Sequence, residues 1–324
     1  MRSPRFASAL LLSFALLAAP GLPAAPPDPA TFSIAAADPA SGEVGVAVAS
    51  RFFAVGTVVP WARAGVGAVA TQASANTSFG PNGLDLMARG ATAEEALEIL
   101  LRGDEGRGRR QVGLVSASGD SATFTGPGCN AWAGGRRGAN YAVQGNILTG
   151  EPVVAAMEAS FVASAGKPLA ERLLLALGAG DEAGGDSRGR QSAALLVCRA
   201  KGGYNGFTDR AVDVRVDDHA DPFGELSRLV AMGVVNDFWN RGWTAFTEKR
   251  FAEALKWQEQ ATVRAEAQPA MLPEVVYDLA VIRLAAGDRP GALAAARRAL
   301  KLNPKLAAQA ASDPDLEAIR AELR

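Results

Sequence analysis

Histidine is almost absent from this 324-residue sequence, in which His219 is the single example. A Ser-His-Asp triad would have to use His219, and no Gly-x-Ser-x-Gly motif precedes an expected helix. The sequence also lacks a CxxC motif, a phosphate-binding loop and a dinucleotide-binding fingerprint. These absences argue against the common His-dependent hydrolases and nucleotide-dependent enzymes, and no cofactor is expected.

An excess of charge of one sign is lacking as well. The formal net charge is -1 and no long basic run occurs, so the sequence gives no electrostatic support for a nucleic-acid partner.

Cysteine is limited to Cys129 and Cys198. Because nothing in their spacing pairs them, two free or buried thiols are favoured over a disulfide.

One acidic cluster surrounds the single histidine, namely Asp217, Asp218, His219 and Asp221. These side chains could act as metal ligands, but zinc sites normally use two or more His or Cys residues at fixed spacing. A solvated loop at the end of a strand is the favoured interpretation, and no metal is expected.

The N-terminus has the three-part pattern of a secretory signal. Arg2 and Arg5 precede an apolar run that is too short for a stable membrane span, and small residues and prolines follow. We expect residues 1–24 to be a signal peptide and residues 25–30 to be a proline-rich leader. The protein is therefore expected to be exported, to the periplasm or beyond.

Short apolar strands and amphipathic helices are expected from residue 31 to about residue 232. Strands come in groups and helices come in groups, which favours an α+β fold over a parallel βαβ arrangement. The expected strands are 31–37, 43–50, 65–72, 111–116, 121–125, 141–144, 192–198 and 211–216, and the expected helices are 83–89, 92–102, 152–163 and 168–177. A glycine-rich loop is expected over residues 178–189.

The composition changes from about Phe223 onward. Glycine becomes rare, and alanine, leucine, arginine and glutamate recur with helical spacing. Small residues repeat with an offset of about 38, against a tetratricopeptide period of about 34, so the linker at residues 267–273 is expected to carry an insertion. We expect residues 233–324 to form a small all-α, tetratricopeptide-like module with a capping helix at 314–323. A generic helical tail is the alternative.

Without a usable histidine, an N-terminal threonine remains as a candidate nucleophile. Thr31 starts the first expected strand, and a free α-amine titrates near neutrality, so it can accept the hydroxyl proton. Ser50, Arg51 and Asn146 end or follow strands, where they could supply polar support and an oxyanion donor. Each also has a purely structural interpretation, as a strand-starting, turn or charge-pairing residue. Candidate substrate-binding residues are Thr71, Gln72, Asn76, Asp186, Arg190 and Gln191.

Several ordered blocks of the chain resemble the bacterial domain-of-unknown-function family 1028. The resemblance covers about residues 31–232 and is carried by residues 31–34, 45–50, 59–62, 65–72, 144–146, 184–193 and 216–219. That family looks like a member of the N-terminal-nucleophile (Ntn) hydrolase superfamily. The resemblance therefore implies a four-layer αββα sandwich, with two antiparallel sheets between outer helices, and hydrolysis of an amide bond.

The superfamily's roles can be placed on this sequence residue by residue. Thr31 matches the nucleophile and its α-amine the base, while Ser50 and Arg51 fall where the superfamily often keeps an acidic residue and a nearby cation. Asn146 is the candidate oxyanion donor. The leader is a departure from the pattern, because Thr31 must be released by trimming or by self-cleavage of the Ala30–Thr31 bond.

Two functions follow from these patterns. The first is an exported amidohydrolase that cleaves a small amide or peptide-like bond and whose helical module binds a protein partner or a second copy. The second is a non-catalytic exported binding protein that keeps the sandwich fold. The true N-terminal residue of the mature chain distinguishes them.

Overall fold

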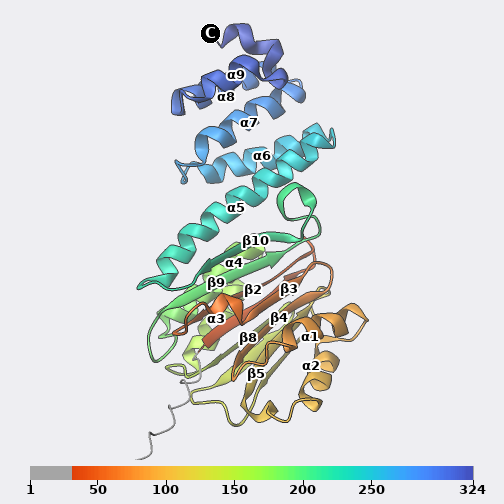
Figure 1. Cartoon of the computed structure of the whole chain (residues 1–324), viewed down its shortest axis with the longest axis vertical. Coiled ribbons are helices and arrows are strands. Elements are labelled where there is room, and N and C mark those ends of the chain that lie inside the picture. Colours follow the sequence, from red (N-terminus) through yellow and green to blue (C-terminus); the bar gives the residue numbers. More distant parts are fainter. Residues whose placement is uncertain (1–30, 324) are drawn as a thin grey trace, which may run out of the picture.

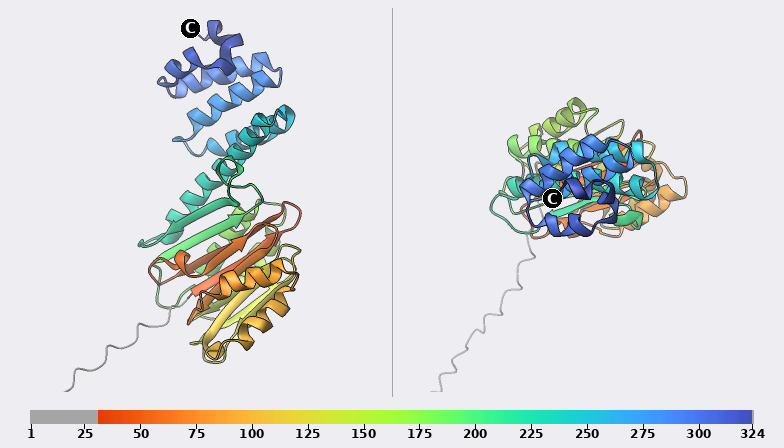
Figure 2. Two further views of the ribbon diagram at one scale, coloured as in Figure 1. Left: turned by 45° about the vertical axis from the view of Figure 1, so that its right-hand side comes forward. Right: turned by 90° about the horizontal axis from the view of Figure 1, so that it is seen from above.

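The computed structural model describes residues 31–323, which form an α+β architecture. Two antiparallel β-sheets lie at one end of the molecule, and a region of helices follows them toward the C-terminus (Figure 1). Figure 2 shows the helices of this region stacked one beyond another, away from the sheets. The α+β class expected from the sequence is confirmed.

The larger sheet has six strands in the order β10-β9-β2-β1-β8-β7. Its central hairpin is the pair β1 and β2, joined by a tight turn whose Gly42 has a positive φ of 71° that favours glycine. The strands of this sheet are β1 (Thr31–Asp38), β2 (Glu43–Ser50), β7 (Gly134–Gly138), β8 (Tyr141–Asn146), β9 (Ser192–Cys198) and β10 (Arg210–Val216).

The smaller sheet has four strands in the order β3-β4-β5-β6. Its β5–β6 hairpin turns through residues 117–120, as the sequence predicted. The strands are β3 (Pro60–Arg63), β4 (Gly67–Ala73), β5 (Arg110–Ser116) and β6 (Ser121–Thr125).

The two sheets pack face to face through small side chains. Alternation along β1 directs Ala35 and Ala37 toward the smaller sheet, whereas Phe32 and Ile34 point to the opposite face. The shared layer also contains Val46, Val48, Ala68, Ala70 and Val115, all of them buried. Because Thr31 has the same parity as Ala35, its side chain faces the space between the sheets.

Helices cover the outer faces of both sheets. Helices α3 (Pro152–Ala163) and α4 (Leu169–Glu182) pack on the larger sheet, and α1 (Phe79–Ala88) and α2 (Ala93–Arg102) pack on the smaller one. The predicted capping box of α2 is confirmed, because Glu95 N donates to Thr92 Oγ1 at 3.2 Å and Thr92 N donates to Glu95 Oε2 at 2.8 Å.

Some local predictions differ from the structure. The glycine-rich loop was expected to start at Gly178, but α4 continues to Glu182. A Cβ at Gly180 would lie 2.7 Å from Met157 Cγ, so the close approach of α3 and α4 explains this glycine inside a helix.

Strands β3 and β7 were not predicted. Both are short edge strands, and β7 has the sequence GGRRG, which shows no apolar alternation.

The C-terminal region begins with the long helix α5, which packs on β9 and β10. The domain boundary expected between residues 232 and 233 lies inside this helix. Where the sequence predicted a capping helix, the structure has a 3₁₀ segment. The helical segments are α5 (Pro222–Thr247), α6 (Phe251–Ala265), α7 (Leu272–Ala285), α8 (Arg289–Leu302), α9 (Leu306–Ser312) and η4 (Pro314–Glu322).

The repeated small residues of this region are buried where helices meet. Ala254, Ala261, Ala280, Ala292 and Ala299 are all fully buried, which allows neighbouring helix axes to approach closely. A regular spacing of small residues therefore organises the contacts between successive helices.

Candidate functional site

A row of polar residues crosses the larger sheet at one end. Thr31 pairs directly with Ser50 on β2 and with Asn146 on β8, and Ser50 pairs in turn with Ser192 on β9. Directly opposite residues of an antiparallel pair point to the same face, so the four side chains lie side by side. Each is at most 2% exposed. Three of the predicted site residues, Thr31, Ser50 and Asn146, are thus brought together.

Thr31 and Ser50 are joined through their side chains. The Thr31 Oγ1 and Ser50 Oγ atoms lie 3.2 Å apart, within hydrogen-bond distance, and either hydroxyl can be the donor. In the full-length chain the nitrogen of Thr31 belongs to the Ala30–Thr31 peptide bond. A free α-amine at this position therefore requires cleavage of that bond.

The smaller sheet contributes two glutamines that face this row. Gln72 Nε2 donates to the carbonyl oxygen of Thr31 at 3.1 Å and to Gln111 Oε1 at 2.8 Å. Asn146 Nδ2 donates to the same Gln111 oxygen at 3.0 Å. The predicted residue Gln72 therefore lies at the site and contacts the backbone of Thr31.

Gln111 is a site residue that the sequence reasoning missed. It is fully buried in β5, immediately before the apolar run Val112 to Val115. Buried polar side chains are normally hydrogen-bonded to specific partners, so a glutamine beside such a run was the available signal. Its partner Asn146 is 35 residues away on the other sheet, which the local pattern does not reveal.

The loop that follows α4 closes this end of the larger sheet. Asp186 accepts a hydrogen bond from the backbone nitrogen of Arg51 at 2.7 Å, and its side chain is only 2% exposed. The Arg51 guanidinium is exposed and donates to the carbonyl oxygen of Arg188 at 2.8 Å. Arg51 and Asp186 therefore tie the loop to the end of β2, next to Ser50.

A cleft of about 290 Å³ opens beside Ser50, on the face of the sheet that carries α4. Arg190 stands at this cleft and forms a two-point ion pair with Asp181, with bonds of 2.7 and 2.6 Å. Gln191 donates to Asp218 at 3.1 Å. The cleft is lined by Phe32, Ala49, Ser50, Asp181, Gly184, Asp186, Gly189, Arg190, Ser192, Ala220, Pro222 and Phe223.

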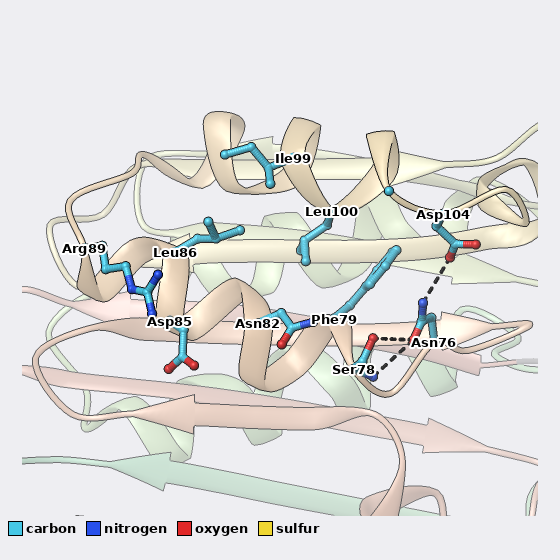
Figure 3. A pocket seen from close by; sticks show the side chains of 11 residues that line it. Asn76, Ser78, Phe79, Asn82, Asp85, Leu86, Arg89, Ile99, Leu100 and Asp104 are labelled. Atoms are coloured by element: carbon cyan, nitrogen blue, oxygen red, sulfur yellow. Dashed lines mark hydrogen bonds between the residues drawn. The ribbon is translucent and has the colours of Figure 1, made fainter.

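Asn76 lies in a different place, in a groove of about 390 Å³ between α1 and α2 (Figure 3). Its side-chain amide donates to Asp104 at 3.1 Å, and its backbone oxygen accepts from Thr71 Oγ1 at 3.1 Å. Asp104 also pairs with Arg110 at 2.8 Å, and this hydrogen bond is the largest cause that holds the Asp104 pKa well below its usual value. Thr71 and Asn76 therefore stabilise the segment between β4 and α1.

The acidic cluster around His219 does not converge on one point. His219 Nδ1 lies 2.8 Å from the backbone oxygen of Asp221, and Asp218 accepts from Gln191. Across residues 31–323 no group of three or more His, Cys, Asp or Glu side chains is arranged to hold a metal ion. Cys129 Sγ donates to the carbonyl oxygen of Arg110 at 3.4 Å, and Cys198 is a buried free thiol whose pKa burial raises to about 12.

None of the helices in the described part of the chain is long and apolar enough to cross a membrane.

A comparison with curated proteins finds no match. Among solved structures, the protein SPO2555 from Silicibacter pomeroyi, itself a DUF1028 protein, is 32% identical. The match has a TM-score of 0.57 and covers 63% of this chain and 89% of that one.

The family of unknown function DUF1028 matches residues 31–226, which is more than half of the chain. The match begins at Thr31, the first residue of β1. This extent agrees with the resemblance expected from the ordered sequence blocks. The chain belongs to the DUF1028 family of unknown function.

Proposed function

We propose that this protein is an exported amidohydrolase of the N-terminal-nucleophile type, with a four-layer αββα sandwich and Thr31 as its nucleophile. The observation that supports this most is the row of Asn146, Thr31 and Ser50 on one face of three neighbouring strands. A hydroxyl at the first position of the family match is thereby flanked by a second hydroxyl and by a carboxamide.

The reaction requires a free Thr31 α-amine, produced by hydrolysis of the Ala30–Thr31 bond. The neutral amine accepts the hydroxyl proton while Thr31 Oγ1 forms a bond to the carbonyl carbon of the substrate amide. The carbon–nitrogen bond then breaks, and the leaving amine takes the proton from the α-ammonium group. Water, with the α-amine as base, hydrolyses the ester at Thr31, which releases a carboxylic acid and regenerates the hydroxyl.

The neighbouring residues suit supporting roles. Asn146 Nδ2 carries two hydrogens and donates one of them to Gln111 Oε1, so the other can be donated to a developing oxyanion. Ser50 can donate to Thr31 Oγ1 and hold its orientation. The cleft beside Ser50 has the size for a small amide or peptide-like substrate, with Asp186, Arg190 and Gln191 close to it. It lies on the α4 face of the sheet, whereas Thr31 Oγ1 faces the space between the sheets, so the substrate must reach Thr31 around the end of the strands at Ser50.

The helical region is proposed to be a tetratricopeptide-like module that binds a protein partner or a second copy of the chain. Its succession of packed helices and the burial of small residues at a regular spacing support this assignment. Repeat helices of this type present extended surfaces to other chains.

The N-terminus and its reactivity test the proposal. The exported protein is purified and its intact mass measured, then treated with a β-lactone, an electrophile that N-terminal threonine nucleophiles open to an ester. We expect a mature chain that starts at Thr31 and one added β-lactone on Thr31. Thr31→Ala should abolish labelling, while Thr262→Ala, which removes a buried hydroxyl of α6, should not.

A chain that starts only before Thr31, with no labelling, would overturn the enzymatic proposal. The burial of Thr31 and the amide state of its nitrogen in the full-length chain favour a second candidate in that case. The protein would then be an exported binding protein, and its cleft and helical module would act in recognition.

A further inference from the structure

We infer that Gln111 is a positioning residue for the proposed reaction, one that fixes both the carboxamide of Asn146 and the backbone of Thr31. This inference rests on the proposed function for its chemistry, and on hydrogen bonds between the two sheets for its geometry. Two hydrogen-bonded arms meet at Gln111, because its side-chain oxygen accepts from Asn146 and from Gln72. The first arm is the contact with Asn146, and the second runs through Gln72 to the backbone of Thr31.

The orientation of the Gln111 amide is determined by its own partners. Its Nε2 donates to the carbonyl oxygens of Gly145 at 2.7 Å and Gly134 at 3.2 Å, and lies 2.9 Å from Thr125 Oγ1. A rotation of the amide by 180° would place its oxygen against two carbonyl oxygens, which is repulsive. The Gln111 oxygen is therefore held toward Asn146 and Gln72.

That fixed oxygen in turn orients Asn146. A carboxamide can exchange the positions of its oxygen and nitrogen by rotation, and only the nitrogen can donate to an oxyanion. Because Gln111 presents an acceptor, the Asn146 nitrogen is the atom that faces it, at 3.0 Å. Gln111 thus selects the orientation in which Asn146 has a second N–H for the reacting carbonyl.

The second arm runs through Gln72 to the nucleophile. Gln72 Nε2 bridges Gln111 Oε1 and the carbonyl oxygen of Thr31 at 2.8 and 3.1 Å. Loss of the Gln111 oxygen would leave Gln72 with a weaker set of acceptors and would release its hold on the first residue of β1. Partners that orient metal-ligating side chains typically contribute about 10- to 100-fold to activity, and we expect an effect of the same order for Gln111.

Gln144 offers a matched control within the same layer. It is also fully buried and faces the space between the sheets, but its side-chain nitrogen donates to Ser33, at 2.6 Å to the hydroxyl oxygen. Its side chain does not bond to Asn146 or Gln72 by any contact found in residues 31–323. Loss of this side chain leaves a similar cavity and keeps both direct contacts of Gln111; it reaches Gln72 only indirectly, through Ser33 Oγ, which donates to Gln72 Oε1 at 2.5 Å.

The test compares crystal structures of the full-length Gln111→Leu and Gln144→Leu proteins with that of the unsubstituted protein. We expect the Asn146 carboxamide to rotate or move only in Gln111→Leu. Labelling of Thr31 by a β-lactone should be about 10- to 100-fold slower in that variant and less than about 3-fold slower in Gln144→Leu. If Gln111→Leu does not fold, Gln111→Glu at pH 5 replaces it. Full burial of this position favours the neutral carboxyl, whose carbonyl oxygen can accept from both Asn146 and Gln72, so the variant should preserve the Asn146 orientation and much of the labelling rate that the unsubstituted protein shows at the same pH.

The two hypotheses fail in different ways. Unsubstituted protein that is never labelled at Thr31 contradicts the proposed function, whereas the crystal structures still decide the role of Gln111. An Asn146 carboxamide that keeps its place and contacts in Gln111→Leu overturns the inference, as does equal slowing of labelling in both leucine variants. A displaced Asn146 in Gln111→Glu at pH 5 also overturns it.

Discussion

The side-chain oxygens of Thr31 and Ser50 lie 3.2 Å apart on neighbouring strands, at the buried end of the central hairpin. If Ser50 orients the nucleophile, Ser50→Ala should slow β-lactone labelling of Thr31 about 10-fold, which corresponds to about 1.4 kcal/mol. The rate is measured by intact-mass spectrometry over time. Ser164→Ala, which removes a buried hydroxyl at the end of α3, is the control, and equal rates for the two variants would show that Ser50 has no such role.

Asp104 and Arg110 form a mostly buried ion pair below the groove between α1 and α2. Asp104→Asn should lower the free energy of unfolding by about 3 kcal/mol, because it leaves the Arg110 charge without its partner. The folded-state pKa of Asp104 is depressed, so its stabilisation is complete above about pH 4 and is lost as the pH falls below that value.

Urea unfolding of the full chain at pH 7 and at pH 2.5 checks this prediction. The difference between the original protein and Asp104→Asn should shrink at the lower pH. Asp85→Asn is the control, since Asp85 lines the same groove but its pair with Arg63 is half exposed, and its loss should cost less than about 1 kcal/mol. A pH-independent difference for Asp104→Asn contradicts the argument.

Asp278 of α7 accepts a hydrogen bond from Trp239 Nε1 of α5 at 2.7 Å. The pKa of Asp278 is raised to about 6; burial is the main cause, the hydrogen bond from Trp239 opposes it, and the charges of Asp313 and Glu274 add to the rise. The folded protein therefore binds this proton more tightly than the unfolded chain does, so the contribution of Asp278 to stability falls as the pH rises from about 4 to about 6.

Asp278→Asn should consequently raise the unfolding free energy at pH 7.5 by about 1 to 3 kcal/mol, because the amide oxygen still accepts from Trp239 and carries no buried charge. At pH 4 the two proteins should be nearly equal in stability. Urea unfolding at both pH values gives the comparison. A variant that is less stable than the original protein at pH 7.5 would show that the charged carboxylate is favourable there.

Two acidic and two basic side chains connect the sheets to α5. Glu43 of β2 accepts from Arg199 at 2.8 Å and from Arg241 at 2.5 Å, and Asp237 accepts from both arginines as well. All four side chains are less than one-fifth exposed. Glu43→Gln should lower the unfolding free energy by about 3 kcal/mol, since it leaves two buried arginines to share the single carboxylate of Asp237.

Thermal and urea unfolding of Glu43→Gln measure this effect. Glu225→Gln provides the matched control, because Glu225 pairs with Arg228 on the exposed side of α5 and should contribute less than about 1 kcal/mol. Equal stability losses in the two variants would mean that the buried cluster is no more important than a surface ion pair.

Much of the fold could be predicted from the sequence, because its signals are local. The turn at Asp38 to Gly42, the capping box at Thr92 and the apolar strand Ser192–Cys198 each depend on neighbouring residues. The predictions failed where packing overrides the local pattern. Gly180 reads as a loop residue, but its lack of a side chain lets α4 pack against Met157.

The candidate site shows the same division. Thr31, Ser50 and Asn146 could be selected from the sequence because each stands at the end of a strand. Asn76 was predicted to be a substrate-binding residue, but it lies in the groove between α1 and α2. A position at the end of a strand does not indicate which of several strand ends share one face.

The sequence by itself determined the order of the helices and of all strands except β3 and β7, the change to a helical C-terminal region and the placement of Thr31 at the first position of a buried strand. Local side-chain pattern and turn chemistry are sufficient for these features. Only the tertiary structure decided that Asn146, Thr31 and Ser50 form one row and that Gln111 joins two of them. Strand register and sheet packing bring together residues far apart in the chain, and no local pattern encodes those contacts.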